Sequence, residues 1–281
     1  DDWHMDGKDP YRTKYVDDTE LNPVILFKAR LKLGWSTSQV LAVGDYFYVV
    51  ASTPNRDNLF GLSRGTYLYR IPIDFNFQGN YSRSQQVEDL LKKGARWVRI
   101  TDYVQSYSSP TYDPVTGLFY VGVGERVYVV DEDPFTRKPY VFDFNARLTA
   151  SPLMVGNDLF AIATSTSKNN GGRLYLVKGL GSGRVSFARW SVSTLQNAEI
   201  ANATKTDGDG IGVGVNYRDS IRQGRYAVFD VKDNGFGSKP SLSFRWKEPF
   251  TAETGVAAHG IYYGGNLYFA EKYGGIYSLR A

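Results

Sequence analysis

The chain has no cysteine and only two histidines and two methionines among its 281 residues. Without cysteine it has no disulfide framework, no thiolate nucleophile and no thiolate zinc site. The two histidines, His4 and His259, are far apart in the sequence, which argues against a histidine-rich metal centre. Most metal-dependent and nucleophilic chemistries therefore have no basis in the composition.

Long apolar runs and runs of like charge are missing as well. No stretch approaches the roughly 18–20 consecutive apolar residues of a membrane-spanning helix, and the sequence is polar from Asp1 onward, unlike a secretory signal peptide. The net charge is +4, without a basic run that would follow a phosphate backbone. We therefore expect a monomer that has no transmembrane segment and binds no nucleic acid.

Tyrosine, phenylalanine and glycine are abundant instead. The chain holds 21 Tyr, 16 Phe and 29 Gly, a composition that favours strands joined by tight turns. We predict an all-β protein with a single domain over residues 1–281. Residues 1–23 form its N-terminal segment, and residues 24–281 carry the strands.

Five imperfect repeats of about 40–50 residues follow one another along the chain. Each has a segment of small residues, a strand of aromatic and β-branched residues, a glycine turn and a further strand. The pattern is clearest in the copies that begin at Ser109-Pro110 and Ser151-Pro152, and most diverged over 201–230. This period predicts a five-bladed β-propeller of four-stranded antiparallel sheets, because small residues suit the crowded inner strands and aromatic residues suit the outer ones.

The last repeat ends on the strand predicted at 274–280, with no outer strand after it. An unmatched apolar segment, 24–30, precedes the first repeat. We expect this N-terminal strand to pair with 274–280, because it would close the ring and cover an exposed sheet edge.

One helix interrupts the repeats. Residues 84–93 carry Val87 and Leu90 at helical spacing, with Ser84 as the expected N-cap and Gly94 as the expected stop. The alternative is that residues 74–94 hide the strands of a sixth blade.

The sequence resembles the bacterial PQQ-type repeat proteins. Trp3 is followed by Asp9-Pro10 and then by a basic residue and Thr13, as in the opening motif of that family, and Val127–Asp131 stands where its repeat has Leu-Tyr-Ala-Leu-Asp. The resemblance implies an exported propeller of WD40-like architecture, in the bacterial periplasm or on the cell surface. It points to a non-enzymatic member of the family.

The departures from the family concern its enzymes. Its quinone-dependent alcohol dehydrogenases hold PQQ with a vicinal cysteine pair, a calcium or lanthanide ion and a catalytic aspartate. Because this chain has no cysteine and no matching acidic cluster, none of those residues carries over and PQQ is not expected. We predict no catalytic residue and no cofactor, apart from the calcium ion considered next.

The loop Asp207-Gly208-Asp209-Gly210 is the candidate metal site. Alternating carboxylates can wrap a Ca²⁺ ion with oxygen ligands, and we consider Asp207 and Asp209 for that role. Asp-Gly pairs are also common hairpin turns, and the loop lacks the downstream bidentate glutamate of an EF-hand. The turn is the preferred interpretation.

Three residues are candidates for ligand binding near the channel of the propeller. His259 would face the channel as an acid, base or ligand, or else serve as a hydrogen-bonded structural histidine. Glu253 is one of the few acidic residues near an inner strand, and Trp35 lies beside small residues at the expected channel mouth. The tryptophans at 97, 190 and 246 recur at one repeat position, which favours packing between neighbouring blades.

Three functions fit these features. The preferred one is a non-catalytic, exported binding or scaffolding propeller that engages a protein or glycan partner. The second is a glycan-acting hydrolase or lyase with carboxylates at the channel mouth, and the third is an ion- or small-ligand-binding sensor.

Overall fold

The computed structural model describes residues 31–36, 38–75, 81–104, 108–133, 135–165, 172–191, 198–217, 224–235, 237–256 and 260–281. This part of the chain forms five antiparallel sheets, here called sheets I to V in chain order, and one α-helix. The predicted all-β class is confirmed. The N-terminal segment 1–23 and the expected closing strand 24–30 lie outside the described residues.

Sheets I and II each have four strands in sequence order. The strands of sheet I are β1 (Leu41–Val43), β2 (Tyr46–Thr53), β3 (Gly65–Pro72) and β4 (Arg96–Thr101). The strands of sheet II are β5 (Thr111–Asp113), β6 (Leu118–Val123), β7 (Arg126–Asp131) and β8 (Thr136–Asp143). Every residue of β6 is buried, as expected for a strand whose sheet is packed on both faces.

Sheets III to V continue the series. Sheet III contains β9 (Leu153–Gly156), β10 (Leu159–Thr164), β11 (Arg173–Lys178) and β12 (Ser186–Ser191). Sheet IV contains β13 (Ala198–Lys205), β14 (Gly210–Tyr217), β15 (Arg225–Lys232) and β16 (Ser241–Phe244), and β17 (Phe250–Thr251) also pairs with β15. Sheet V contains β18 (Ile261–Tyr263), β19 (Asn266–Ala270) and β20 (Ile276–Arg280). Sheets I to III thus have the predicted four strands, while sheet IV has five and sheet V three.

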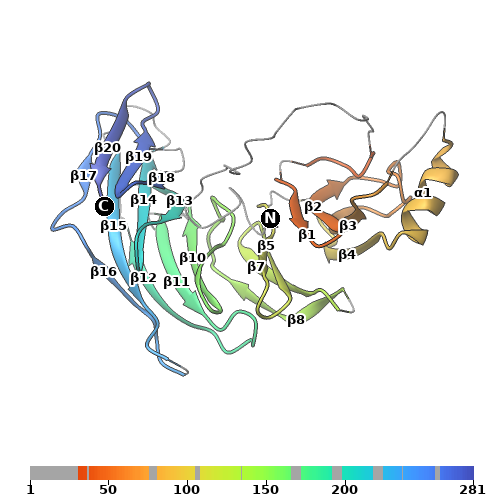
Figure 1. The fold of residues 1–281 in the computed structure, drawn as a ribbon, viewed down its shortest axis with the longest axis horizontal. Helices are drawn as coiled ribbons and strands as arrows, with labels where there is room; N and C mark the ends of the chain where they lie inside the picture. Colours follow the sequence, from red (N-terminus) through yellow and green to blue (C-terminus); the bar gives the residue numbers. More distant parts are fainter. Residues whose placement is uncertain are drawn as a thin grey trace.

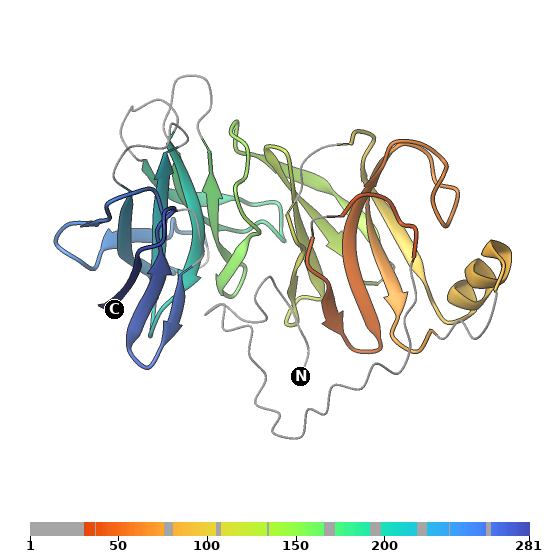
Figure 2. The ribbon, with the colours of Figure 1, turned by 90° about the horizontal axis from the view of Figure 1, so that it is seen from above.

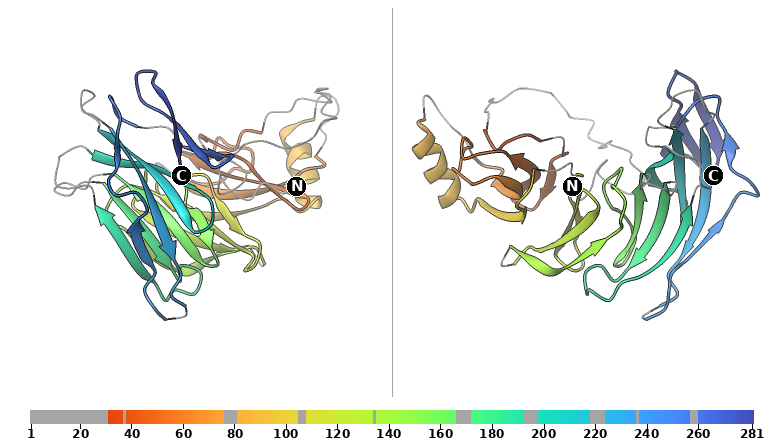
Figure 3. Two further views of the ribbon diagram at one scale, coloured as in Figure 1. Left: turned by 60° about the vertical axis from the view of Figure 1, so that its left-hand side comes forward. Right: turned by 180° about the vertical axis from the view of Figure 1, so that it is seen from behind.

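The five sheets lie along an arc, with sheet I at one end and sheet V at the other (Figures 1 and 3). Figure 2 shows the same order from above. Side chains from both sheets of each consecutive pair form a hydrophobic cluster. The clusters are centred on Phe119 between sheets I and II, Phe160 between II and III, Phe229 between III and IV, and Tyr226 between IV and V.

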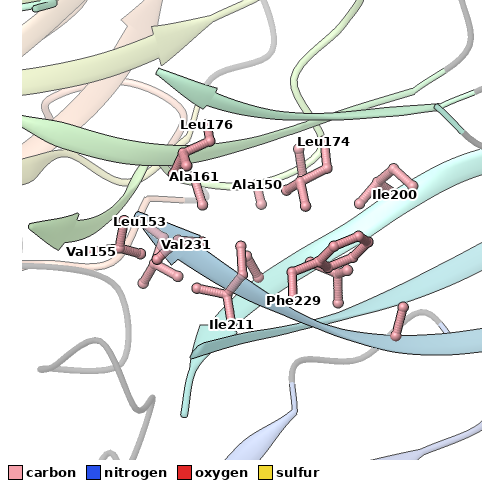
Figure 4. Close-up of a cluster of buried hydrophobic side chains, with 14 of the residues drawn as sticks. Ala150, Leu153, Val155, Ala161, Leu174, Leu176, Ile200, Ile211, Phe229 and Val231 are labelled. Carbon is pink, nitrogen blue, oxygen red and sulfur yellow. The ribbon is translucent and has the colours of Figure 1, made fainter. Parts of the chain in front are cut away.

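The cluster between sheets III and IV shows how the packing follows from strand alternation (Figure 4). Leu174 and Leu176 lie on one face of β11, and Ile211 and Phe229 face them from sheet IV. Trp190 packs against this cluster, which confirms that it lies between neighbouring sheets.

The predicted helix is present as α1 (Arg83–Lys92). Its N-cap is Ser82 and not Ser84, because Ser82 and Gln85 form a reciprocal capping box. Gly94 follows the helix at φ +95°, as expected for a residue that stops it. The described part of 74–94 contains α1 and no strand.

Candidate binding surface

The two ends of the arc differ in how their outer faces are covered. At sheet I, residues 31–33, residues 59–62 and α1 pack over the face that points away from sheet II; we call them the cover. Within it, the Phe60 ring stacks on Trp97 at 4.5 Å between centroids, and Leu90 of α1 is fully buried. Trp97 therefore packs against the cover, and not between two neighbouring sheets as predicted.

Asn58 fixes the loop of the cover from inside. Its buried side chain donates from Nδ2 to the Leu62 carbonyl at 2.8 Å and accepts from the Leu62 N–H at 3.0 Å. Arg83, at the start of α1, donates from Nε to the Leu59 carbonyl at 3.0 Å. These bonds hold the loop and the helix together over sheet I.

Sheet V has no such cover among the described residues. Along β19, Leu267 and Phe269 are buried against sheet IV, while Tyr268 between them points to the opposite face and is 37% exposed. Strand pairing places Ile261 opposite Tyr268 on that face, and Ile276 of β20 lies there too, 79% exposed. We call this surface the outer face of sheet V.

The outer face exposes several large apolar side chains. It and the adjoining turn carry five large exposed hydrophobic side chains, namely Ile261, Tyr263, Tyr268, Tyr273 and Ile276. Apolar side chains gathered in this way mark interaction sites, whereas a single exposed one needs no explanation.

The opposite face of sheet V is packed as tightly as an internal face. Phe269 stacks on Tyr226 of sheet IV with 4.1 Å between ring centroids and 7° between ring planes. Tyr277 of β20 stacks on Phe269 at 5.4 Å. Sheet V is therefore packed against sheet IV on this face, whereas its outer face is exposed within the described residues.

Within the described residues, the edge of sheet V formed by β20 is also unpaired. The N–H of Ala281 donates to the carbonyl of Gly265 at 3.2 Å, and this bond flanks the pair formed by Asn266 and Arg280. In an antiparallel ladder, such a flanking bond marks a pair that is not itself hydrogen-bonded. In the same way, the N–H of Glu271 donates to the carbonyl of Gly275 at 2.9 Å and flanks the pair formed by Ala270 and Ile276.

The alternation then fixes where the remaining backbone groups of β20 point. Tyr277 and Leu279 form the hydrogen-bonded pairs with β19. The N–H and C=O groups of Ile276, Ser278 and Arg280 therefore point away from β19. On that side, β20 carries no further strand within the described residues, whereas the third strands of sheets I to III are each paired with a fourth.

A hollow of about 550 Å³ adjoins this edge. It is lined by Trp246, Glu248, Pro249, Phe250, Thr251, Leu279 and Arg280. The lining includes aromatic and aliphatic side chains and one charged residue of each sign, Glu248 and Arg280. Leu279 and Arg280 belong both to the lining of the hollow and to β20.

A second hollow of about 600 Å³ lies between sheets I and II. Arg126 donates from Nε to the Asp143 carboxylate at 2.8 Å; partial burial opposes ionisation of Asp143, but this bond holds its pKa below the ordinary value. The guanidinium of Arg137 lies over the Tyr128 ring, 5.6 Å from its centroid. Most charged side chains of this groove therefore interact with one another or with Tyr128.

The structure separates the sequence-predicted site residues. Trp35 is exposed beside sheet I, where it forms an isolated backbone bridge with Ser52 of β2. Glu253 is exposed in the loop between β17 and β18, near the other end of the arc. His259 lies outside the described residues, and the ligand-binding roles of all three stay predictions.

The loop at Asp207 and Asp209 is a turn between β13 and β14, with Gly208 at φ +53°. The Asp207 carboxylate accepts a hydrogen bond from Arg245 Nη1 at 2.5 Å, and Arg245 also binds Asp230 at 2.7 Å. No three His, Cys, Asp or Glu residues of the described ranges gather closely enough to hold a metal ion. The calcium site stays a prediction.

Comparison with known proteins identifies the architecture. The sequence matches no family profile and no curated protein. Among solved structures, the chain is similar to a europium-containing methanol dehydrogenase, with a TM-score of 0.57 and 12% sequence identity. The fold is that of a β-propeller.

The propeller match covers 99% of this chain and 56% of the dehydrogenase, so the chain spans little more than half of that protein's length. The β-propeller domain of Cps50 (Swd1) from Myceliophteria thermophila is also similar, with a TM-score of 0.35 and 12% identity over 90% of this chain and 87% of that chain. The propeller prediction is confirmed, whereas membership of the PQQ-type family and non-enzymatic status stay predictions. No helix among the described residues is long and apolar enough to cross a membrane.

Proposed function

We propose that this propeller is a non-catalytic binding or scaffolding protein that engages a protein partner at sheet V. The observation that carries the proposal is the contrast between the two ends of the arc. Sheet I has a packed cover, while sheet V leaves an apolar face and a sheet edge uncovered within the described residues.

The chemistry of the surface favours a protein over a glycan. Aliphatic side chains, Ile261 and Ile276, stand beside Tyr263 and Tyr268 on the outer face. Tyrosine and apolar side chains are typical of protein interfaces, where burying each large apolar side chain contributes about 1.5–3 kcal/mol before the costs of association. An exported location, implied by the family resemblance, is part of the proposal.

A peptide selection tests this function. Short random peptides displayed on phage are selected on the full chain and retested on two variants. The Tyr268→Ser/Ile276→Ser double variant removes apolar area from the outer face, and Val115→Ser removes an equally exposed side chain from the turn before β6 of sheet II.

We expect most selected peptides to lose binding to the double variant and to keep it for Val115→Ser. Peptides that bind all three proteins equally would show that sheet V is not the preferred surface. A selection that yields no binders would contradict the proposal as well.

A further inference from the structure

We propose that the groove between sheets I and II binds a sugar acid, that is, a carboxylate carried on a hydroxylated ring, and that Arg137 binds the carboxylate. This site lies away from sheet V, so it is a second site and does not depend on the proposed function. The volume of the groove, about 600 Å³, is in the range of small-ligand sites.

Strand pairing brings Arg137 to the face of sheet II that lines the groove. Tyr128 and Val130 of β7 belong to the hydrophobic cluster between sheets I and II, so their face of β7 points to sheet I. In the register of β7 and β8, Val130 lies opposite Arg137 and Tyr128 lies opposite Val141. Because residues paired across antiparallel strands share a face, Arg137 and Val141 point to sheet I as well.

The charged side chains of the groove form ion pairs and leave one guanidinium over. Arg99 Nη1 lies 3.1 Å from the Asp102 carboxylate, and Arg126 Nε lies 2.8 Å from the Asp143 carboxylate. Within the described ranges, Arg137 forms no ion pair. With three arginines and two aspartates in its lining, the groove has a net charge of +1. It therefore favours an anion, and Arg137 is the residue left to bind it.

Tyr128 orients the Arg137 side chain for this role. The guanidinium carbon lies 5.6 Å from the centroid of the buried Tyr128 ring, a cation–π contact. Such a contact occupies one face of the guanidinium plane and leaves its N–H edge, which matches a carboxylate through two parallel hydrogen bonds. Arg137 is exposed, so a ligand in the groove can reach this edge.

The rest of the lining suits a hydroxylated ring. The two ion pairs supply carboxylate oxygens that accept hydrogen bonds from hydroxyl groups and guanidinium N–H groups that donate to them. Tyr103 is 63% exposed, so its ring offers a surface for the C–H face of a sugar. The backbone of Tyr103 is held in place, because its carbonyl accepts a hydrogen bond from Thr66 Oγ1 at 2.8 Å.

Two other classes of ligand fit this lining less well. The carboxylates of Asp102 and Asp143 would repel a phosphate dianion more strongly than an anion with one charge. An apolar ligand would remove the ion pairs from water without offering them hydrogen bonds. A single carboxylate matches the single guanidinium that has no acidic partner.

Calorimetric titration of the full chain tests the proposal with three sugars: D-glucuronate, the trimer of galacturonate, and D-glucose. We expect a sugar acid to bind and glucose, which has the ring of glucuronate without its carboxylate, to show no binding. Glucuronate that binds as tightly as the trimer would identify a free sugar acid as the ligand. Much tighter binding of the trimer would identify a uronate-bearing polysaccharide, and either result supports the site.

The decisive variant is Arg137→Gln, which removes the charge from an exposed side chain. Arg189→Gln is the matched control, because it removes an exposed arginine from β12, outside the groove. We expect Arg137→Gln to bind the sugar acid roughly tenfold or more weakly and Arg189→Gln to bind it as the parent does. Tyr103→Ala should also weaken binding, and the melting temperatures of all three variants should stay close to that of the parent.

Several results would overturn the proposal. A parent chain that binds neither sugar acid, or binds glucose equally well, has no site of this kind. Inorganic phosphate that displaces glucuronate at equal concentration would show a general anion site, and triglutamate that binds as tightly as the galacturonate trimer would show a site for acidic peptides. Equal weakening by Arg137→Gln and Arg189→Gln would show that only the net charge of the chain matters.

Discussion

The strongest stability prediction compares two adjacent residues of β19, Phe269 and Tyr268. Phe269 is 3% exposed and stacks on Tyr226 and Tyr277, so Phe269→Ala would leave a cavity between sheets IV and V. Truncation of a buried phenylalanine costs about 3–5 kcal/mol in the free energy of unfolding. Tyr268 points to the outer face, and Tyr268→Ala should cost about 1 kcal/mol or less, as for most surface positions.

Urea unfolding of the full chain, followed by tryptophan fluorescence, measures both differences. The slope of the free energy against urea must be unchanged for the comparison to hold. Equal costs for the two variants would refute the reasoning. A large cost for Tyr268→Ala in particular would mean that another part of the chain covers the outer face of sheet V.

Three further variants or conditions test other parts of the account. Asn58→Ala should lower the free energy of unfolding by about 2–4 kcal/mol, because it removes several hydrogen bonds inside the cover; calorimetry checks this, and a loss near zero would contradict the bracing role. Burial raises the pKa of Asp158, so the folded state favours the protonated carboxyl more than the unfolded state does. This contribution to stability is complete below the unfolded-state pKa and is lost as the pH rises through the folded-state pKa. Asp158→Asn should therefore be more stable than the parent at neutral pH, with the difference shrinking towards about pH 4, and a difference independent of pH would be the wrong result. Because Arg245 already binds the Asp207 carboxylate, millimolar Ca²⁺ should leave the melting temperature unchanged, and a rise that is lost on chelation would instead support the calcium site.

Much of the fold could be predicted from local patterns. The aromatic and β-branched segments separated by glycine turns coincide with the second and third strands of the sheets, and the spacing of Val87 and Leu90 predicts α1. The N-cap was misplaced by two residues, because Ser82 and Ser84 are equally good caps until the partner of each is known. Here Gln85 selects Ser82 by completing the capping box.

The binding surface could not be predicted in the same way. Successive residues of β19, such as Leu267 and Tyr268, point to opposite faces of the sheet, as they do in the internal sheets. The sequence does not indicate which of the two faces packs against another sheet. The cover of sheet I was equally invisible, because Asn58 gives no signal until the loop around it is folded. The sequence pattern predicts Trp35 at the channel mouth and Glu253 near an inner strand, whereas the structure places them at different ends of the arc.

Amide hydrogen exchange at single-residue resolution tests the central claim most directly, because the N–H groups of an open edge strand alternate between bonded and solvent-facing. The account predicts protection at Tyr277 and Leu279 and fast exchange at Ile276, Ser278 and Arg280 in the isolated chain. Uniform protection along β20 would contradict it, since that pattern requires a strand already paired at the edge of sheet V.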